Sequence, residues 1–226
     1  MHKDWESTTL GDIATLTIGR TPSRNDPSFW TTDLSRPFCS IADMTGPVVV
    51  PTREGVTQVA EEAGKAKRVP AGSLLMSFKL TIGRVGFAGC DLFPNEAIVW
   101  VEPRERDEVD KKFLASLLGA YDYSPFIASA IKGGTLNLTS MKSLPLRIPE
   151  LDEQIRIADL MAAVDDEFDA LREARARTEI LRTALLQDLL SGAHRIPESY
   201  DRLLKKQAAT SGAEAAQGQE SNQAAA

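Results

Sequence analysis

The sequence predicts an α+β fold in which one globular domain is followed by a long α-helix that forms a coiled coil. Two features of the 226-residue chain support this prediction. Over residues 1–148, short apolar runs alternate with Gly, Pro, Ser and Asp, a pattern typical of closely spaced strands with few crossover helices. Over residues 150–191, neither Gly nor Pro interrupts the chain, and apolar or small side chains recur every three or four positions. We therefore expect antiparallel strand pairing first and a continuous helix afterwards.

Strands are expected wherever β-branched, aromatic and other apolar residues form a short run bounded by turn residues. In chain order these runs are 38–41, 48–50, 74–78, 84–88 and 97–101, of which 48–50 is the weakest. Helical periodicity appears in about 57–65 and 111–121. The apolar face of the second of these helices consists of Phe113, Leu114, Leu117 and Leu118.

Residues 149–192 are expected to form the long helix. Asp152 and Glu153 suit a helix N-terminus, and Gly192 suits the position just after a helix end. Some 40 residues would give a rod of roughly 60 Å. A rod with a one-sided apolar stripe needs a partner helix, although packing along its own domain is an open alternative. The expected partner-facing residues are Ile157, Met161, Val164, Phe168, Leu171, Leu181 and Leu185.

Residues 193–226 form a C-terminal extension. From about residue 204 the composition is dominated by Ala, Gln, Gly, Ser and Glu, with too little apolar bulk to build a core. We expect this low-complexity part to be disordered and assign it no function.

The composition excludes several classes of protein. No run of about 18 uncharged apolar residues exists, so a membrane span is not expected. The N-terminus lacks the apolar stretch of a secretory signal, and two cysteines in no metal-binding spacing favour a reducing, cytoplasmic location. The net charge is −6, with an acidic excess of one in residues 1–150 and five in 151–226. This balance argues against a protein that coats nucleic acid through bulk charge, but it permits basic residues to gather on one face.

The residues typical of catalysis are missing from the predicted domain. The two histidines, His2 and His194, lie near the ends of the chain, so neither a Ser-His-Asp triad nor a histidine metal site is expected. The glycines of residues 83–89 are spaced evenly by three, unlike a dinucleotide-binding fingerprint. We expect no catalytic residues, no bound metal and no cofactor in this chain.

An ordered set of motifs covers about 190 residues of the chain. The motifs are, in chain order, Trp5, Leu10-Gly11-Asp12-Ile13-Ala14, Gly19-Arg20-Thr21-Pro22-Ser23, Phe29-Trp30, Ile41-Ala42-Asp43-Met44, Gly72-Ser73-Leu74-Leu75-Met76-Ser77, Thr81-Ile82-Gly83-Arg84-Val85-Gly86, Asn95-Glu96-Ala97, Gly134-Thr135-Leu136-Asn137, Ile148-Pro149 with Leu151, Glu153-Gln154 and Ile157-Ala158, and finally Leu181 to Gly192. This ordered set resembles the specificity subunits of type I restriction–modification systems. One motif departs from the family, because Glu96 stands where Gln is usual.

The resemblance implies a target recognition domain over 1–148 that binds double-stranded DNA, and a helix over 149–192 for dimerisation and subunit docking. The pattern occurs once, where a full subunit has it twice, so the chain resembles a half-subunit that pairs with a second copy or another half-subunit. A two-fold pair would recognise a palindromic bipartite site. The implied partners are modification subunits, which bring S-adenosylmethionine, and a restriction subunit, which brings ATP and Mg²⁺. The chain itself would be non-catalytic.

Three polar clusters are candidates for DNA contact, because Arg, Lys, Asn, Ser and Thr on loops bind bases and phosphates. The first two alternatively maintain turns or contact only phosphate. The clusters are Arg20, Thr21, Ser23 and Arg24; Lys79, Thr81 and Arg84; and Lys132, Asn137, Thr139 and Lys142. Two rival functions stay open: an assembly protein that keeps the scaffold without DNA recognition, and a nuclease that uses scattered carboxylates.

Overall fold

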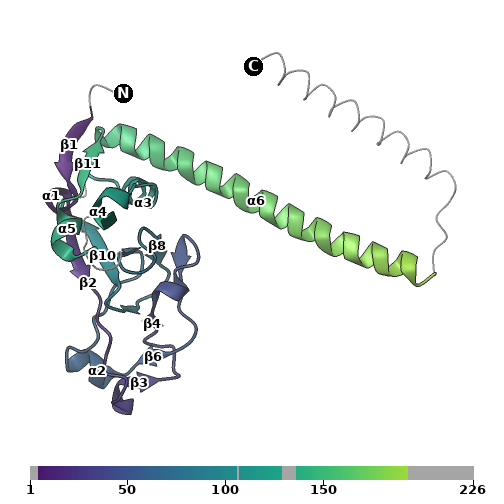
Figure 1. Cartoon of the computed structure of the whole chain (residues 1–226), viewed down its shortest axis with the longest axis horizontal. Coiled ribbons are helices and arrows are strands. Elements are labelled where there is room, and N and C mark those ends of the chain that lie inside the picture. Colours follow the sequence, from purple (N-terminus) through teal and green to yellow (C-terminus); the bar gives the residue numbers. More distant parts are fainter. Residues whose placement is uncertain (1–4, 106, 129–135, 193–226) are drawn as a thin grey trace. The chain divides into compact units, whose positions relative to one another are not determined.

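The computed structural model describes residues 5–105, 107–128 and 136–192 (Figure 1). The chain divides into two compact units, residues 1–164 and 165–226. The predicted α+β class is confirmed, since strands and short helices build the first unit and one helix extends through residues 151–190.

A five-stranded sheet forms the centre of the first unit. Its strand order is β2-β10-β7-β8-β5, and all neighbours are antiparallel except the parallel pair β5 and β8. The strands are β2 (Ala14–Ile18), β5 (Val48–Val49), β7 (Leu74–Ser77), β8 (Val85–Ala88) and β10 (Ile98–Pro103). All but β2 coincide with apolar runs that predicted strands.

Both faces of this sheet are covered, which explains the continuous apolar run of β7. Leu74 and Met76 face one core cluster, while Leu75 between them faces another. Strand β10 behaves in the same way, with Val99 in the first cluster and Ile98 in the second. Because successive side chains of a strand point to opposite faces, a strand buried on both sides needs apolar residues without alternation.

Three two-stranded pairings complete the β-structure. β1 (Glu6–Thr9) pairs antiparallel with β11 (Pro145–Ile148), which joins the N-terminal segment to the residues just before the long helix. β3 (Trp30–Thr31) pairs antiparallel with β6 (Gly55–Val56), and β4 (Phe38–Cys39) pairs in parallel with β9 (Phe93–Pro94). A third, smaller core cluster packs beneath the last two pairs.

Five short α-helices and two 3-10 turns connect these strands. Side-chain caps start three of the helices: Thr57 accepts from the Ala60 N–H, Asp110 from the Phe113 N–H, and Asn137 from the Ser140 N–H. The elements are α1 (Leu10–Ile13), α2 (Gln58–Glu62), α3 (Lys111–Gly119), α4 (Ser124–Ala128), α5 (Leu138–Lys142), η1 (Pro27–Phe29) and η2 (Ile41–Asp43).

The long helix α6 spans Leu151–Leu190, as its lack of Gly and Pro predicted. Gln154, 1% exposed, fastens its first turn to the first unit. The Gln154 side chain donates to the carbonyls of Glu108 and Pro149 and accepts from the Asp110 N–H, each at 2.9 Å. Ala158 is buried one turn later. No helix among the described residues is long and apolar enough to cross a membrane.

Candidate nucleic-acid interface

The loop between β7 and β8 carries the second predicted cluster and is fixed from within by Ser77. The Ser77 hydroxyl donates to the Thr81 carbonyl and accepts from the Arg84 N–H at 3.1 Å. The Ser77 backbone adds two bonds, donating to the Arg84 carbonyl at 2.9 Å and accepting from the Gly83 N–H at 3.0 Å. Ser77 is fully buried, so its hydroxyl and backbone bond to groups of the loop and not to water.

Gly83 is required by the turn of this loop. Its φ is +86°, and a β-carbon there would lie 2.8 Å from the ring of Tyr123. The Thr81-Ile82-Gly83 motif therefore has a structural role that does not depend on nucleic acid, in line with the alternative that it maintains a turn.

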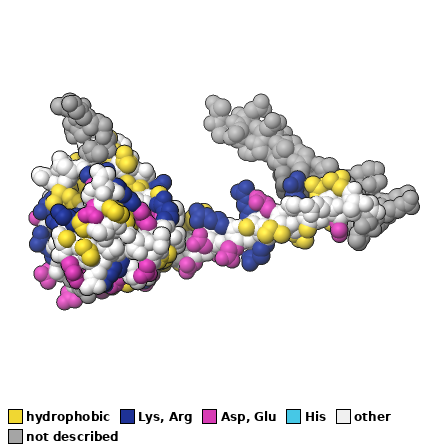
Figure 2. Space-filling view, turned by 90° about the horizontal axis from the view of Figure 1, so that it is seen from below, with side chains coloured by type: hydrophobic (Ala, Val, Ile, Leu, Met, Phe, Trp, Pro, Cys, Tyr) yellow, Lys and Arg dark blue, Asp and Glu magenta, His cyan; other side chains and the backbone are white. Residues whose placement is uncertain are grey.

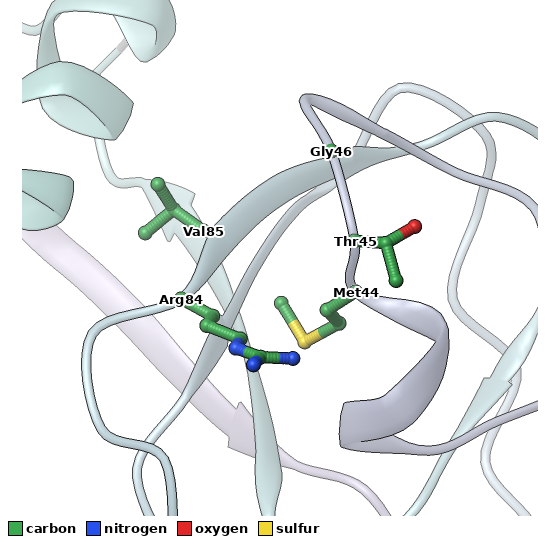
Figure 3. A pocket seen from close by; sticks show the side chains of 5 residues that line it. All are labelled: Met44, Thr45, Gly46, Arg84 and Val85. Carbon is green, nitrogen blue, oxygen red and sulfur yellow. The ribbon is translucent and has the colours of Figure 1, made fainter.

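Arg84 lies beside a shallow hollow of about 430 Å³ (Figure 3). The hollow is lined by Met44, Thr45, Gly46, Arg84 and Val85. The Arg84 guanidinium extends towards Met44 and donates to the Ile41 carbonyl at 3.4 Å. Neither Arg84 nor Lys79 forms an ion pair with another described residue. Both cations are thus available to an anionic partner.

Glu96 brings the first two clusters together. The Thr21 hydroxyl donates to the Glu96 carboxylate. This hydrogen bond lowers the pKa of Glu96, and the nearby charge of Lys79 lowers it further. Thr21 and Lys79, 58 positions apart, therefore both act on the Glu96 carboxylate, Thr21 through a hydrogen bond and Lys79 through its charge. In the sequence, Glu96 is marked only by its departure from the family motif, so it was not predicted as a site residue.

The remaining members of the first cluster have intramolecular partners. Arg20 donates to the Gly64 carbonyl at 2.7 Å. Arg24 donates twice to Glu54, at 2.6 and 2.7 Å, and its guanidinium carbon lies 3.5 Å from the ring centroid of Trp30. These bonds raise the pKa of Arg24, with the hydrogen bond to Glu54 as the largest cause. Arg24 thus has a structural role in this conformation.

Ser23 belongs to the same structural group. Its carbonyl accepts from the indole N–H of Trp30 at 3.0 Å, and its hydroxyl accepts from the Asn25 N–H at 3.3 Å. Ser23 therefore contacts the Trp30 indole N–H and Arg24 stacks on the Trp30 ring, so both residues are engaged within the domain.

The third cluster is only partly described. Lys132 lies outside the described residues. Asn137 caps α5, since its side-chain Oδ1 accepts from the Ser140 N–H at 2.8 Å. Thr139 and Lys142 are exposed on the same short helix. The available members of this cluster are therefore Thr139 and Lys142.

A second hollow, of about 450 Å³, disfavours nucleic acid because its lining is acidic. It lies where β1, β11 and the start of α6 meet residues 107–109. Its carboxylates are Glu6, Asp12, Asp107, Glu108 and Glu150. On the visible face of residues 5–164, basic, acidic and apolar side chains are otherwise interspersed (Figure 2). No cluster of three or more metal-ligating side chains occurs among the described residues.

The apolar residues of α6 separate into two groups. Ile157 packs against the main core cluster of its own unit, so it is not free to face a partner helix. The other predicted partner-facing residues are exposed, and apolar side chains are visible on the surface of the rod (Figure 2). Ile180 and Leu181 are 70% and 68% exposed. Because adjacent helical residues point about 100° apart, these two apolar side chains lie in different directions around the helix. The apolar surface is thus broader than the single stripe that the sequence predicted.

Solved structures with a similar fold come from type I restriction–modification systems. A solved type I restriction–modification complex contains a similar chain (TM-score 0.66, 21% identity), of which 46% is matched by 85% of this chain. The HsdS subunit of Thermoanaerobacter tengcongensis is similar too, with a TM-score of 0.60 and 19% identity over 83% of this chain and 45% of that one.

The chain belongs to the family of type I restriction modification DNA specificity domains, whose model matches residues 2–182. The MjaIX specificity subunit of Methanocaldococcus jannaschii is 25% identical over 82% of this chain and 43% of its own length. The HindI specificity subunit of Haemophilus influenzae is 24% identical over 84% of this chain and 42% of its own. The chain therefore spans less than half the length of these relatives.

Proposed function

We propose that this chain recognises DNA as a specificity component of a type I restriction–modification system. The observation that supports this most is the family match over residues 2–182, which includes the whole domain and most of α6. The relatives are named specificity subunits, so we assign this chain target recognition and no catalysis. Methyl transfer from S-adenosylmethionine and ATP- and Mg²⁺-dependent cleavage belong to partner modification and restriction subunits in this proposal.

DNA contact is proposed for the surface around the β7–β8 loop. Lys79 and Arg84 have no ion-pair partner among the described residues, and the hydrogen bond from Arg84 to the Ile41 carbonyl is long at 3.4 Å. Arg20 donates to the Gly64 carbonyl at 2.7 Å, and Arg24 is paired with Glu54. Thr81 belongs to this loop, and Thr21 donates to Glu96, the carboxylate whose pKa the Lys79 charge lowers. Phosphates attract the two cations that lack an ion-pair partner, and sequence is recognised by groups that reach the base edges.

Pairing through α6 is proposed to supply the second half of a bipartite site. The exposed apolar residues from Met161 onwards require a partner, since side chains this apolar are seldom left in water along one helix. Forty helical residues extend about 60 Å, on the order of 18 base-pair steps of about 3.4 Å. Two identical chains related by a two-fold axis would bind a palindromic pair of half-sites.

The domain limits proposed with this function are 1–148 for target recognition, 149–192 for pairing and subunit docking, and 193–226 for the extension. The first two turns of α6 belong with the recognition domain by packing, because Gln154 and Ala158 are buried there. The acidic surface around Glu6 and Glu150 is a candidate docking area for a basic face of a modification subunit.

Selection from randomised duplexes tests the proposal. The chain is combined with its modification subunit, and bound DNA is sequenced over several rounds. Enrichment of two short blocks with a fixed spacer supports the proposal. A stable protein complex without enrichment would instead favour an assembly protein, and metal-dependent cleavage by the chain alone would favour a nuclease.

A charge-matched pair of variants locates the surface. Lys79→Ala with Arg84→Ala removes two charges from the loop, while Lys65→Ala with Lys67→Ala removes two exposed charges after α2. We expect only the first pair to reduce the slope of log affinity against log salt, by roughly one for each lost phosphate contact. Equal slopes in both pairs would contradict this placement.

A further inference from the structure

Leu80, at the tip of the β7–β8 loop, combines two unfavourable features. Its φ is +60°, and among the described residues it is the one non-glycine residue with a positive φ. Its side chain is 87% exposed, more than any other large apolar side chain in the described chain. A residue with a branched side chain is strained in the left-handed region, and a strained residue that buries nothing gains no packing in return.

The loop holds Leu80 in this position rather than leaving it free to relax. Ser77 closes the loop through the Thr81 carbonyl and the Arg84 N–H. Before Leu80 in the chain, the Phe78 N–H donates to the Ala97 carbonyl at 3.0 Å, and the Phe78 carbonyl accepts from the Leu136 N–H at 3.3 Å. The residues on both sides of Leu80 are thus tied to the sheet and its surroundings, which presents the side chain as a pre-organised apolar group.

The charges around Leu80 favour a polyanion as its partner. Lys79 precedes it directly and Arg84 closes the same loop, and neither has an ion-pair partner among the described residues. The charge of Lys79 lowers the pKa of Glu96, whose carboxylate accepts a hydrogen bond from Thr21. An apolar tip on a loop that also carries two cations suits the major groove of DNA, where phosphates flank the base edges.

Within the major groove, the C5-methyl group of thymine is the apolar feature of the base edges. We propose that Leu80 is a specificity-determining residue that contacts a thymine methyl group, while Lys79 and Arg84 bind the flanking phosphates. This inference rests on the proposed function and adds to it the base that the loop recognises.

Replacing thymine by uracil tests the contact, because this change removes only the methyl group. The target found by duplex selection is synthesised with single uracils at each thymine, and affinity is measured for the complex with the modification subunit. For the natural chain we expect about fourfold weaker binding at one or two positions, which is what burial of one methyl-sized group contributes. Leu80→Asn should bind the thymine and uracil forms equally.

Thermal unfolding of the same variant separates the contact from the fold. Asn adopts a positive φ more readily than Leu, so Leu80→Asn should raise the Tm while it lowers DNA affinity. Leu34→Asn, at a 42% exposed leucine in another loop, is the control and should retain the uracil effect. A higher Tm combined with a lower affinity is an outcome that a purely structural role of Leu80 would not give.

Three results would overturn the inference. One is a uracil effect that persists in Leu80→Asn, and another is a natural chain indifferent to uracil at every thymine. The third is a Leu80→Asn variant that loses the modification subunit but keeps its DNA preference, which would assign Leu80 to a protein contact. A natural chain that enriches no sequence would overturn the proposed function, and this inference with it.

Discussion

The first unit and residues 165–190 of α6 differ in how their ion pairs form and in how far their apolar side chains are buried. Among the described residues of the first unit, the ion pairs join positions 7 to 30 apart, such as Arg68 with Glu61 and Arg24 with Glu54. In residues 165–190, the pairs join positions three or four apart on one helix, such as Arg175 with Glu179. Pairs of the second kind stabilise a helix locally by only about 0.2–0.5 kcal/mol each and position it against nothing.

The apolar residues show the same contrast. The first unit gathers its apolar side chains into three buried clusters around the sheet. Between 165 and 190 the side chains are exposed apart from the half-buried Leu189, and Phe168 and Leu171 are 56% and 58% exposed. Because helical stability in proteins comes mainly from tertiary packing, we infer that this part of α6 acquires its packing from another molecule.

Leu171→Asp tests this inference and should have the largest effect. Leu171 lies near the middle of α6, so in an antiparallel two-fold pair it meets its own symmetry mate or a close neighbour. Replacing it removes roughly 1.5–3 kcal/mol of burial per side chain and places two like charges in a desolvated seam. We expect a folded, monomeric chain, with the dimer dissociation constant raised more than about 100-fold, as measured by light scattering.

Glu173→Ala is the control for this variant. Glu173 is exposed, and its ion-pair partner among the described residues is Arg177, at 3.7 Å on the same helix. Its loss should leave dimerisation unchanged. An intact dimer in Leu171→Asp would show that the helix pairs through another face, for example the one that contains Ile180.

The sequence predicts elements best where burial is expressed locally. Strands β7 and β10 are apolar on both faces and α6 lacks helix breakers, so each was predicted from its own residues. β1 and β11 were not. β1 has no fully buried residue, the alternation of β11 covers only four residues, and the paired residues of the two strands lie about 140 positions apart. A pattern of neighbouring residues gives no information about a pairing partner so far along the chain.

The candidate site was harder to predict for the same reason. Arg24 is a residue type that often contacts DNA, yet its guanidinium is hydrogen-bonded to Glu54, 30 positions away. Glu96 was missed because its role depends on Thr21, 75 positions away. Leu80 gave no sequence signal, because the residue type neither favours a positive φ nor indicates exposure. Site residues defined by long-range partners need the fold before they can be assigned.

Gln154→Leu should have the next largest effect, and it acts on the first unit. The substitution removes three hydrogen bonds and leaves the Asp110 N–H and the carbonyls of Glu108 and Pro149 to find new partners. Unsatisfied buried groups cost about 1–3 kcal/mol each, so we expect a loss of roughly 2–4 kcal/mol in the free energy of unfolding.

Urea unfolding measures this loss, with Gln187→Leu on the exposed part of α6 as the matched control. The control should change the unfolding free energy by less than about 0.5 kcal/mol. Equal effects of the two variants would mean that Gln154 does not fasten the helix to the domain.

The smallest expected effect concerns the pH dependence of the first unit. The hydrogen bond from Arg68 lowers the pKa of Glu61 below its ordinary value of 4.5, and the charge of Arg36 acts in the same direction. A carboxylate with a lowered pKa stabilises the folded state fully above its unfolded pKa, and this contribution is lost as the pH falls through the folded pKa.

Glu61→Gln should therefore reduce the free energy of unfolding by about 1 kcal/mol or less at pH 7, since the pairs are partly solvent-accessible. The difference from the natural chain should shrink below about pH 4.5 and disappear when Glu61 is protonated in both states. Glu62→Gln changes the same charge one residue later, where the carboxylate accepts from Gln58 on its own helix. If both variants gave the same pH profile, local helix chemistry rather than the long-range pairs would account for the acid sensitivity, and the contrast with α6 would be weaker than the structure indicates.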